Sequence, residues 1–160
     1  MSQEPYVRVG LRLIGTETLT GHELAISYRD RKNTPTYANS IAVGYYPMDV
    51  HDCKAPNTLE SAYDGPTDIP STHRGGAFEV PLGVLIPQTV DGLLVAEKNI
   101  SASRGANGAI REQPIAMDIG QAAGALAALS VKHNTEPRSV SAQDVQATLL
   151  SSGVVTTIPK

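Results

Sequence analysis

Aromatic side chains and cysteine are scarce in this sequence of 160 residues. It contains no tryptophan, one phenylalanine and one cysteine. The single cysteine, Cys53, excludes a disulfide within the chain, and so few aromatic rings leave little material for a platform that stacks nucleic-acid bases. Basic residues are few and scattered, with 13 Lys and Arg against 16 Asp and Glu, which gives a net charge of −3. We therefore expect no nucleic-acid partner.

Signals for export, membrane spanning and metal binding are missing as well. The first four residues, MSQE, lack the basic and apolar regions of a signal peptide, which favours a cytoplasmic protein. The most apolar stretch, 115–131, is interrupted by Asp118 and Gln121, so we expect no membrane span. His22 and His133 have no histidine or cysteine at the spacing of metal ligands, so we expect no metal site.

The glycine-rich fingerprint of dinucleotide-binding proteins, G-x-G-x-x-G between a strand and a helix, is also absent. Gly10 and Gly15 are five residues apart, and Gly105 and Gly108 lie in the wrong context. The sequence therefore offers no phosphate-binding turn for the adenine half of a dinucleotide.

The patterns that are present predict a mixed α+β fold. A chain of this length can enclose a moderate core, whereas a second full domain would be cramped. Apolar alternation predicts strands mostly before Ala96, and helical spacing predicts helices mostly after it. The expected elements are strands at 6–13, 40–47 and 48–52 and on both sides of Pro81 within 77–87, helices at 21–28 and 141–153, and a long loop at 53–76.

The most informative stretch is 91–131. An apolar run at 92–96 predicts a short buried strand, and the next residues have the small and hydrogen-bonding side chains of a binding loop. Pro114 suits the first turn of a helix that extends to Val131, and the start of this helix attracts electron-rich groups. Small residues leave one helix face nearly bare. Taken alone, they are explained most simply by a tight contact between helix and sheet.

The order of LLVA, ISASRGANGAIR and P-x-x-M-x-x-G-Q-A-A-G along this stretch resembles the C-terminal end of a family of FAD-dependent oxidoreductases, related to the glutathione-reductase and fumarate-reductase flavoproteins. The resemblance implies FAD as cofactor. Residues 100–111 would follow the isoalloxazine and ribityl chain, and the helix start at 113–116 would face the flavin pyrimidine. The residues implied to bind the cofactor are Ser101, Ser103, Asn107, Gly108, Arg111, Pro114, Ile115 and Ala116.

Two earlier segments resemble the same family. Residues 39–51 match most of its pattern D-S-I-A-x-x-x-Y-P-x-D-x-H, and residues 5–15 match part of P-Y-x-R-E-x-R-R-[IL]-x-G. His51 is the candidate general acid or base because imidazole titrates near neutral pH and Asp49 can orient it, although an exposed histidine at a strand end explains it as well. Arg8 is the candidate for an anionic substrate group, whereas without the family it fits a solvated strand face. The chain departs from the family at Val9, Leu11, Leu82 and Gly83.

The resemblance implies a substrate-domain-like β region at 1–90 with a lid loop at 53–76, the C-terminal part of an FAD-binding α/β domain at 91–153, and a tail at 154–160. The implied function is to complete a flavin site for hydride transfer between an organic substrate and FAD. Since the fingerprint is missing, a complementing N-terminal flavoprotein chain would have to supply the rest of the site.

The alternative hypothesis is a truncated flavoprotein remnant that no longer binds FAD. Such a chain would act as a homo-oligomer or protein-interaction module, because a strand at 92–96 without its sheet would expose an edge and an apolar face. A binder of small molecules without redox chemistry is a third interpretation.

Overall fold

The computed structural model describes residues 10–29, 31–49 and 76–159. They combine helices with a small sheet, so the predicted α+β class is confirmed. The helices and strands are α1 (Gly21–Arg29), β1 (Ser40–Tyr45), β2 (Ala77–Pro81), α3 (Arg104–Ile110), α4 (Gln113–His133) and α5 (Ala142–Ser151). Short 3₁₀ turns occur at η1 (Arg31–Asn33), η2 (Leu82–Leu85), η3 (Glu97–Asn99) and η4 (Pro137–Ser139).

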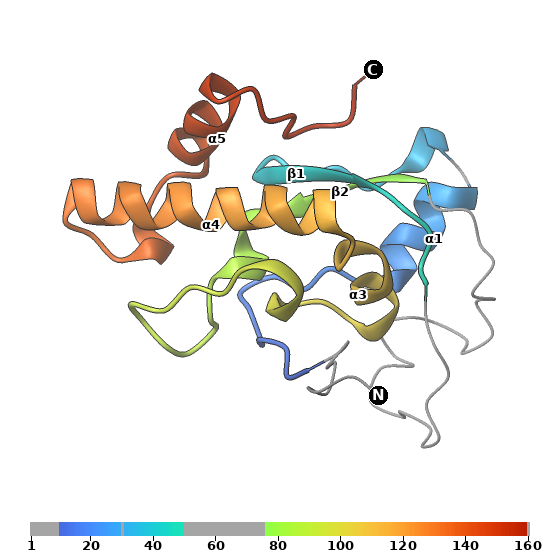
Figure 1. Ribbon diagram of the computed structural model, residues 1–160, viewed down its shortest axis with the longest axis horizontal. Coiled ribbons are helices and arrows are strands. Elements are labelled where there is room, and N and C mark those ends of the chain that lie inside the picture. The colour runs from blue at the N-terminus through green and yellow to red at the C-terminus, as the bar shows by residue number, and fades with distance from the viewer. Residues whose placement is uncertain (1–9, 30, 50–75, 160) are drawn as a thin grey trace, which may run out of the picture.

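The longest element is α4, and the other elements lie around it. Pro114 occupies its first turn, where a missing N–H breaks no helical hydrogen bond. The helix ends at Asn134, whose left-handed backbone (φ 49°) directs its N–H back to the carbonyl oxygens of Ser130 and Val131. The N-terminal part of α4 lies beside β1, with α3 before its N-terminus and α5 following its C-terminal end (Figure 1).

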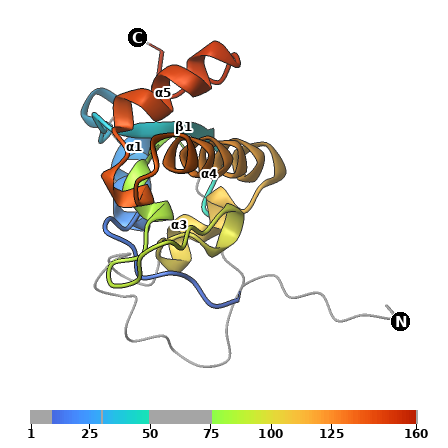
Figure 2. The ribbon, with the colours of Figure 1, turned by 90° about the vertical axis from the view of Figure 1, so that its left-hand side faces the viewer.

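The sheet of the described residues has two antiparallel strands, β1 and β2. Val43 lies opposite Glu79, and the register is irregular between Ser40 and Ala42. Two strands alone are marginally stable in water. Helices α4 and α5 both contact β1 (Figure 2), and this packing supplies the burial that the sheet needs.

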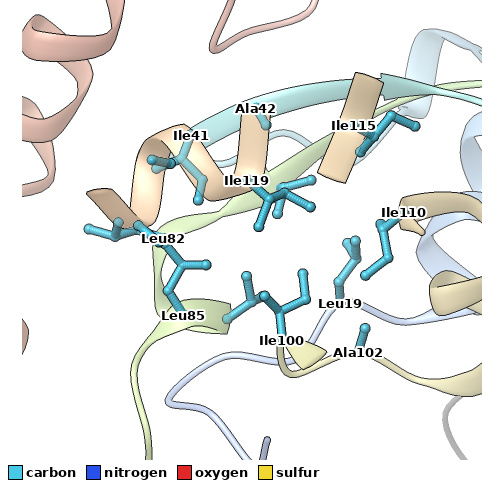
Figure 3. Packing of buried hydrophobic residues seen from close by; sticks show 14 of the residues in the cluster. Leu19, Ile41, Ala42, Leu82, Leu85, Ile100, Ala102, Ile110, Ile115 and Ile119 are labelled. Atoms are coloured by element: carbon cyan, nitrogen blue, oxygen red, sulfur yellow. The ribbon is translucent and has the colours of Figure 1, made fainter. Parts of the chain in front are cut away.

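Side chains from distant parts of the chain share one core. Ile115 and Ile119 project from α4 into a cluster that contains Leu19, Leu85 and Ile100 (Figure 3). Full burial of a Leu or Ile side chain stabilises the fold by about 1.5–3 kcal/mol. The cluster therefore fixes the N-terminal half of α4 against residues from both predicted regions, 1–90 and 91–153.

The backbone at 100–103, which follows η3, is hydrogen-bonded to two other segments of the chain. Leu19 N donates to Ser101 O (3.0 Å), and Ser103 N donates to Leu19 O (2.9 Å). On the other side, Ser101 N donates to Val84 O (2.9 Å). This segment consequently has the role in the core that the sequence assigned to 92–96.

The strand predicted at 92–96 does not form. Gly92 has a positive φ of 67°, and Leu93 is exposed. Val95 N donates to Leu85 O (3.1 Å), but the run is not paired as a strand. An apolar run indicates burial, whereas a strand also needs neighbouring backbone to pair with, and that backbone lies beside 100–103 instead.

Other elements also differ from the sequence prediction. The binding loop expected after residue 99 contains α3, because the Ser103 hydroxyl accepts from Ala106 N (3.3 Å) and caps that helix. The second strand expected after Pro81 is the buried turn η2. Residues 10–13 of the expected strand at 6–13 have no regular structure, and neither do residues 48–49 of the one at 48–52. The rest of both strands and residues 53–75 of the expected loop lie outside the described residues.

The three predicted helices form with the expected starts. In α1, Thr20 N donates to Glu23 Oε2 (2.8 Å) and Glu23 N donates to Thr20 Oγ1 (3.3 Å), which completes a capping box. In α5, Asp144 N donates to Ser141 Oγ (3.3 Å). The polar capping residues therefore located the starts of α1 and α5, and Pro114 located the start of α4.

Carboxylates hold the segment before β1 in place. Tyr37 donates its hydroxyl to Glu23 Oε1 (2.6 Å) and its backbone N–H to Glu79 Oε2 (2.8 Å). The other oxygen of buried Glu79 accepts from Ile158 N (2.9 Å). Glu79 thus joins β2 to the tail as well as to the residues before β1.

Tyr37 predicts a loss of stability in alkali. Burial first, then the hydrogen bond to Glu23 and the charges of Glu23, Glu17 and Glu79, raise its pKa far above the ordinary 10.0. The unfolded phenol ionises near pH 10 while the folded one stays protonated, so its contribution is complete below about pH 10 and falls as the pH rises further. We expect the free energy of unfolding, measured with urea between about pH 9 and about pH 11, to fall more steeply with pH in the wild type than in Tyr37→Phe. Equal slopes would contradict this assignment.

Candidate functional site

The predicted cofactor residues do not all lie together. Asn107, Gly108, Arg111, Pro114 and Ile115 lie in α3, at the turn after it or in the first turn of α4. The two serines precede α3 in the segment 100–103. The structure therefore places the most compact group of candidates at the turn between α3 and α4, which we call the α3–α4 turn (residues 107–116).

Ser101 and Ser103 are buried, and their hydroxyls are hydrogen-bonded within the chain. Ser101 Oγ shares a hydrogen bond with Thr18 Oγ1 (2.8 Å). Ser103 Oγ caps α3 and also accepts from Gly21 N (2.9 Å). In this structure both serines join the first helix region to α3, and their roles as cofactor ligands stay a prediction.

Asn107 presents a buried acceptor. Its side chain donates from Nδ2 to Lys98 O (2.8 Å), yet Oδ1 has no hydrogen-bond partner among the described residues. The residue is 1% exposed. An unsatisfied buried oxygen costs free energy, so it is a feature to be explained by a binding partner or by a water molecule.

Gly108 brings α3 against the backbone that follows β1. A Cβ at this position would lie 2.9 Å from Asp49 O and 3.1 Å from Asp49 C. Only glycine allows this approach without movement of one backbone. The sequence had suggested that the glycines here serve a ligand, whereas the structure gives Gly108 a contact within the chain.

Arg111 lies between two carboxylates. Its Nη2 forms an ion pair with Asp49 Oδ2 and lies 3.4 Å from Asp49 O, while Nη1 lies 3.4 Å from Glu112 Oε1. The sequence singled out Arg111, and it placed Asp49 beside His51. It could not predict that Asp49 meets Arg111, because 62 positions separate them.

The start of α4 lies beside this ion pair. Glu112 is its N-cap but makes no capping hydrogen bond with its side chain, and the first turn holds no acidic residue. Pro114 is exposed, Ile115 is buried in the core, and Ala116 donates its N–H to Glu112 O (2.9 Å). The positive end of the helix dipole is thus not matched by an acid in the first turn, and it favours electron-rich groups. Sequence reasoning missed Glu112, because glutamate is not among the residues that usually cap a helix start.

One carboxyl group near this end of α4 has a shifted titration. Burial raises the pKa of Asp118 above its ordinary value. His51, Arg8 and residues 53–75 of the lid loop at 53–76 lie outside the described residues. Within the described ranges, no three His, Cys, Asp or Glu side chains are grouped so that they could hold a metal ion.

The outward face of α4, which consists of Met117, Gly120, Gly124 and Val131, has few contacts. Met117 is 72% exposed and Val131 is 82% exposed. A Cβ at Gly120 or Gly124 would meet no described atom within 4 Å. By length and composition α4 is apolar enough to cross a membrane, which the sequence had not led us to expect, and 28% of its most apolar window is buried. Ile115 and Ile119 belong to the protein core, as they would in a core helix.

The residues of the α3–α4 turn fit one end of a flavin in their chemistry. A flavin carries both polar ring atoms and, when reduced, a negative charge. The turn offers a helix start without an acid in its first turn, the guanidinium of Arg111, and the Asn107 oxygen, which has no hydrogen-bond partner among the described residues. No phosphate-binding glycine turn accompanies them in the sequence, so the fit is limited to the flavin end.

Comparison with protein families identifies the family of this chain. The model of the family described as FAD dependent oxidoreductase matches residues 1–149, which is most of the chain. No curated protein matches the chain, and no solved structure does.

Gly108 and Gly120 provide a matched pair of variants. We expect Gly108→Ala to lower the free energy of unfolding by about 1–3 kcal/mol, because the new Cβ would push α3 away from Asp49. Gly120→Ala meets no described neighbour and should raise it by up to about 1 kcal/mol through helix propensity. Denaturation by urea measures both. If Gly108→Ala were as stable as Gly120→Ala, the backbone of Asp49 would not lie as close to Gly108 as the structure places it.

Proposed function

The chain belongs to the FAD-dependent oxidoreductase family, and we propose that it forms the C-terminal part of such an enzyme and completes the flavin end of its FAD site. FAD, when bound, would exchange a hydride with an organic substrate. The observation that carries the proposal is the α3–α4 turn, where Arg111 and the start of α4 lie together within the matched range.

In this proposal the chain's own groups act by position and charge. Arg111 and the N–H groups at the start of α4 would stabilise the electron-rich pyrimidine end of the flavin, above all its reduced, anionic form. Asn107 Oδ1 is an acceptor that a ligand N–H or hydroxyl could satisfy. His51 or Arg8 would handle the substrate proton or an anionic substrate group.

A partner chain is part of the proposal. The sequence has no dinucleotide fingerprint, so a complementing flavoprotein chain would bind the adenine half of FAD. The outward face of α4 supports a partner, because its exposed apolar side chains and bare glycines would let another element approach closely.

A second candidate function is an oligomeric or protein-interaction module without FAD, and the same face of α4 favours it. A homo-oligomer would cover Met117 and Val131 as well as a complementing chain would. Departures from the family at Val9, Leu11, Leu82 and Gly83 point in the same direction. This candidate predicts a colourless oligomer that added FAD does not change.

Replacement of Arg111 tests the proposed flavin site. We expect Arg111→Ala, in the chain assembled with its flavoprotein partner, to weaken FAD binding about 10-fold, because a hydrogen bond from a charged donor is lost. Arg138→Ala is the control, since Arg138 lies in η4, beyond the other end of α4, and pairs with Asp91. FAD affinity is measured by the quenching of flavin fluorescence. Unchanged affinity in Arg111→Ala would count heavily against the proposal.

A further inference from the structure

The side chain of Arg111 is confined by a carboxylate from a distant segment. Arg111 is 11% exposed and its partner Asp49 is 35% exposed. The same Nη2 atom that pairs with Asp49 Oδ2 also faces Asp49 O at 3.4 Å. One residue therefore contacts the guanidinium through both its side chain and its backbone.

Asp49 is itself held in place by packing. Met48 is buried in the core, and Asp49 N donates to Pro47 O (2.8 Å) in a tight turn. The backbone of Asp49 rests on Gly108, where any side chain would collide with it. These contacts consequently fix the backbone from which the Asp49 carboxylate reaches Arg111.

We infer that Asp49 is a positioning residue that holds the guanidinium of Arg111 beside the start of α4. The inference rests on the proposed function, which gives Arg111 its role toward the cofactor. Arginine has several rotatable bonds, and freedom in them must be lost before its planar donor group can serve a ligand. Asp49 removes that freedom before the ligand arrives.

Glu112 does not replace Asp49 in this role. It neighbours Arg111 in sequence and contacts Nη1 at 3.4 Å. Its side chain is about as exposed as that of Asp49, but Asp49 also presents its backbone oxygen 3.4 Å from Nη2. The ion pair with Glu112 is the longer of the two that Arg111 makes, so it confines the guanidinium less than Asp49 does. Loss of Asp49 should therefore leave Arg111 mobile even with Glu112 present.

Nuclear magnetic resonance of the arginine side chains tests the inference on the full chain without cofactor. In the wild type we expect Arg111 to show two separate Nη signals, because the ion pair slows rotation of the guanidinium. Asp49→Ala should merge them while the backbone spectrum stays folded, and Asp49→Asn, which keeps the volume, serves if the alanine variant does not fold. Asp91→Ala is the matched control: it should affect Arg138 and leave Arg111 unchanged. Separate Arg111 signals in a folded Asp49 variant would overturn the inference.

FAD affinity of the assembled protein provides the second readout. We expect Asp49→Ala to weaken binding about 10-fold, as Arg111→Ala does, and the double variant to bind no more weakly than either single variant. If Arg111→Ala weakens binding and Asp49→Ala does not, the positioning inference fails alone. If Arg111→Ala leaves FAD affinity unchanged, the proposed function fails, and with it any functional role for Asp49.

Discussion

Burial of Ile115 and Ile119 against Ile100 and its neighbours is the interaction on which the rest of the structure depends. It fixes the first two turns of α4, and the α3–α4 turn is continuous with them. Arg111 and Glu112 are thereby placed at the edge of the core rather than on an independent loop. The hydrophobic packing beneath the candidate site fixes the positions of its side chains. A cavity beneath α4 would therefore disturb the site and also lower the stability of the fold.

The two faces of α4 have opposite environments. One face fills the core, while the other presents the exposed side chains of Met117 and Val131 and the glycines Gly120 and Gly124, where a Cβ would meet no described atom within 4 Å. A helix of this length with small residues on its open side is suited to close packing against another element. Both proposals therefore concern the same helix: its start carries the proposed flavin contacts, and its outer face is the proposed contact surface for a partner chain.

Local signals predicted the parts of the fold that depend on local interactions. The capping residues Thr20 and Ser141, and Pro114 in a first turn, located three helices correctly. The strand at 92–96 was wrong because its apolar pattern carries no information about which backbone will pair with it. Helix α3 was missed because its glycines were interpreted as loop residues, although Ser103 was an available cap. The contact of Asp49 with Arg111 and Gly108 depends on the tertiary fold, so no local pattern could have predicted it.

The central claim is that this chain completes a flavin site. The most direct test is the visible absorbance of the purified chain after FAD is added, alone and together with a fingerprint-bearing flavoprotein chain, once free FAD has been removed. The account predicts that flavin absorbance stays with the protein and that this requires, or is increased by, the partner. A colourless, compact oligomer that is unaffected by FAD under both conditions would contradict it.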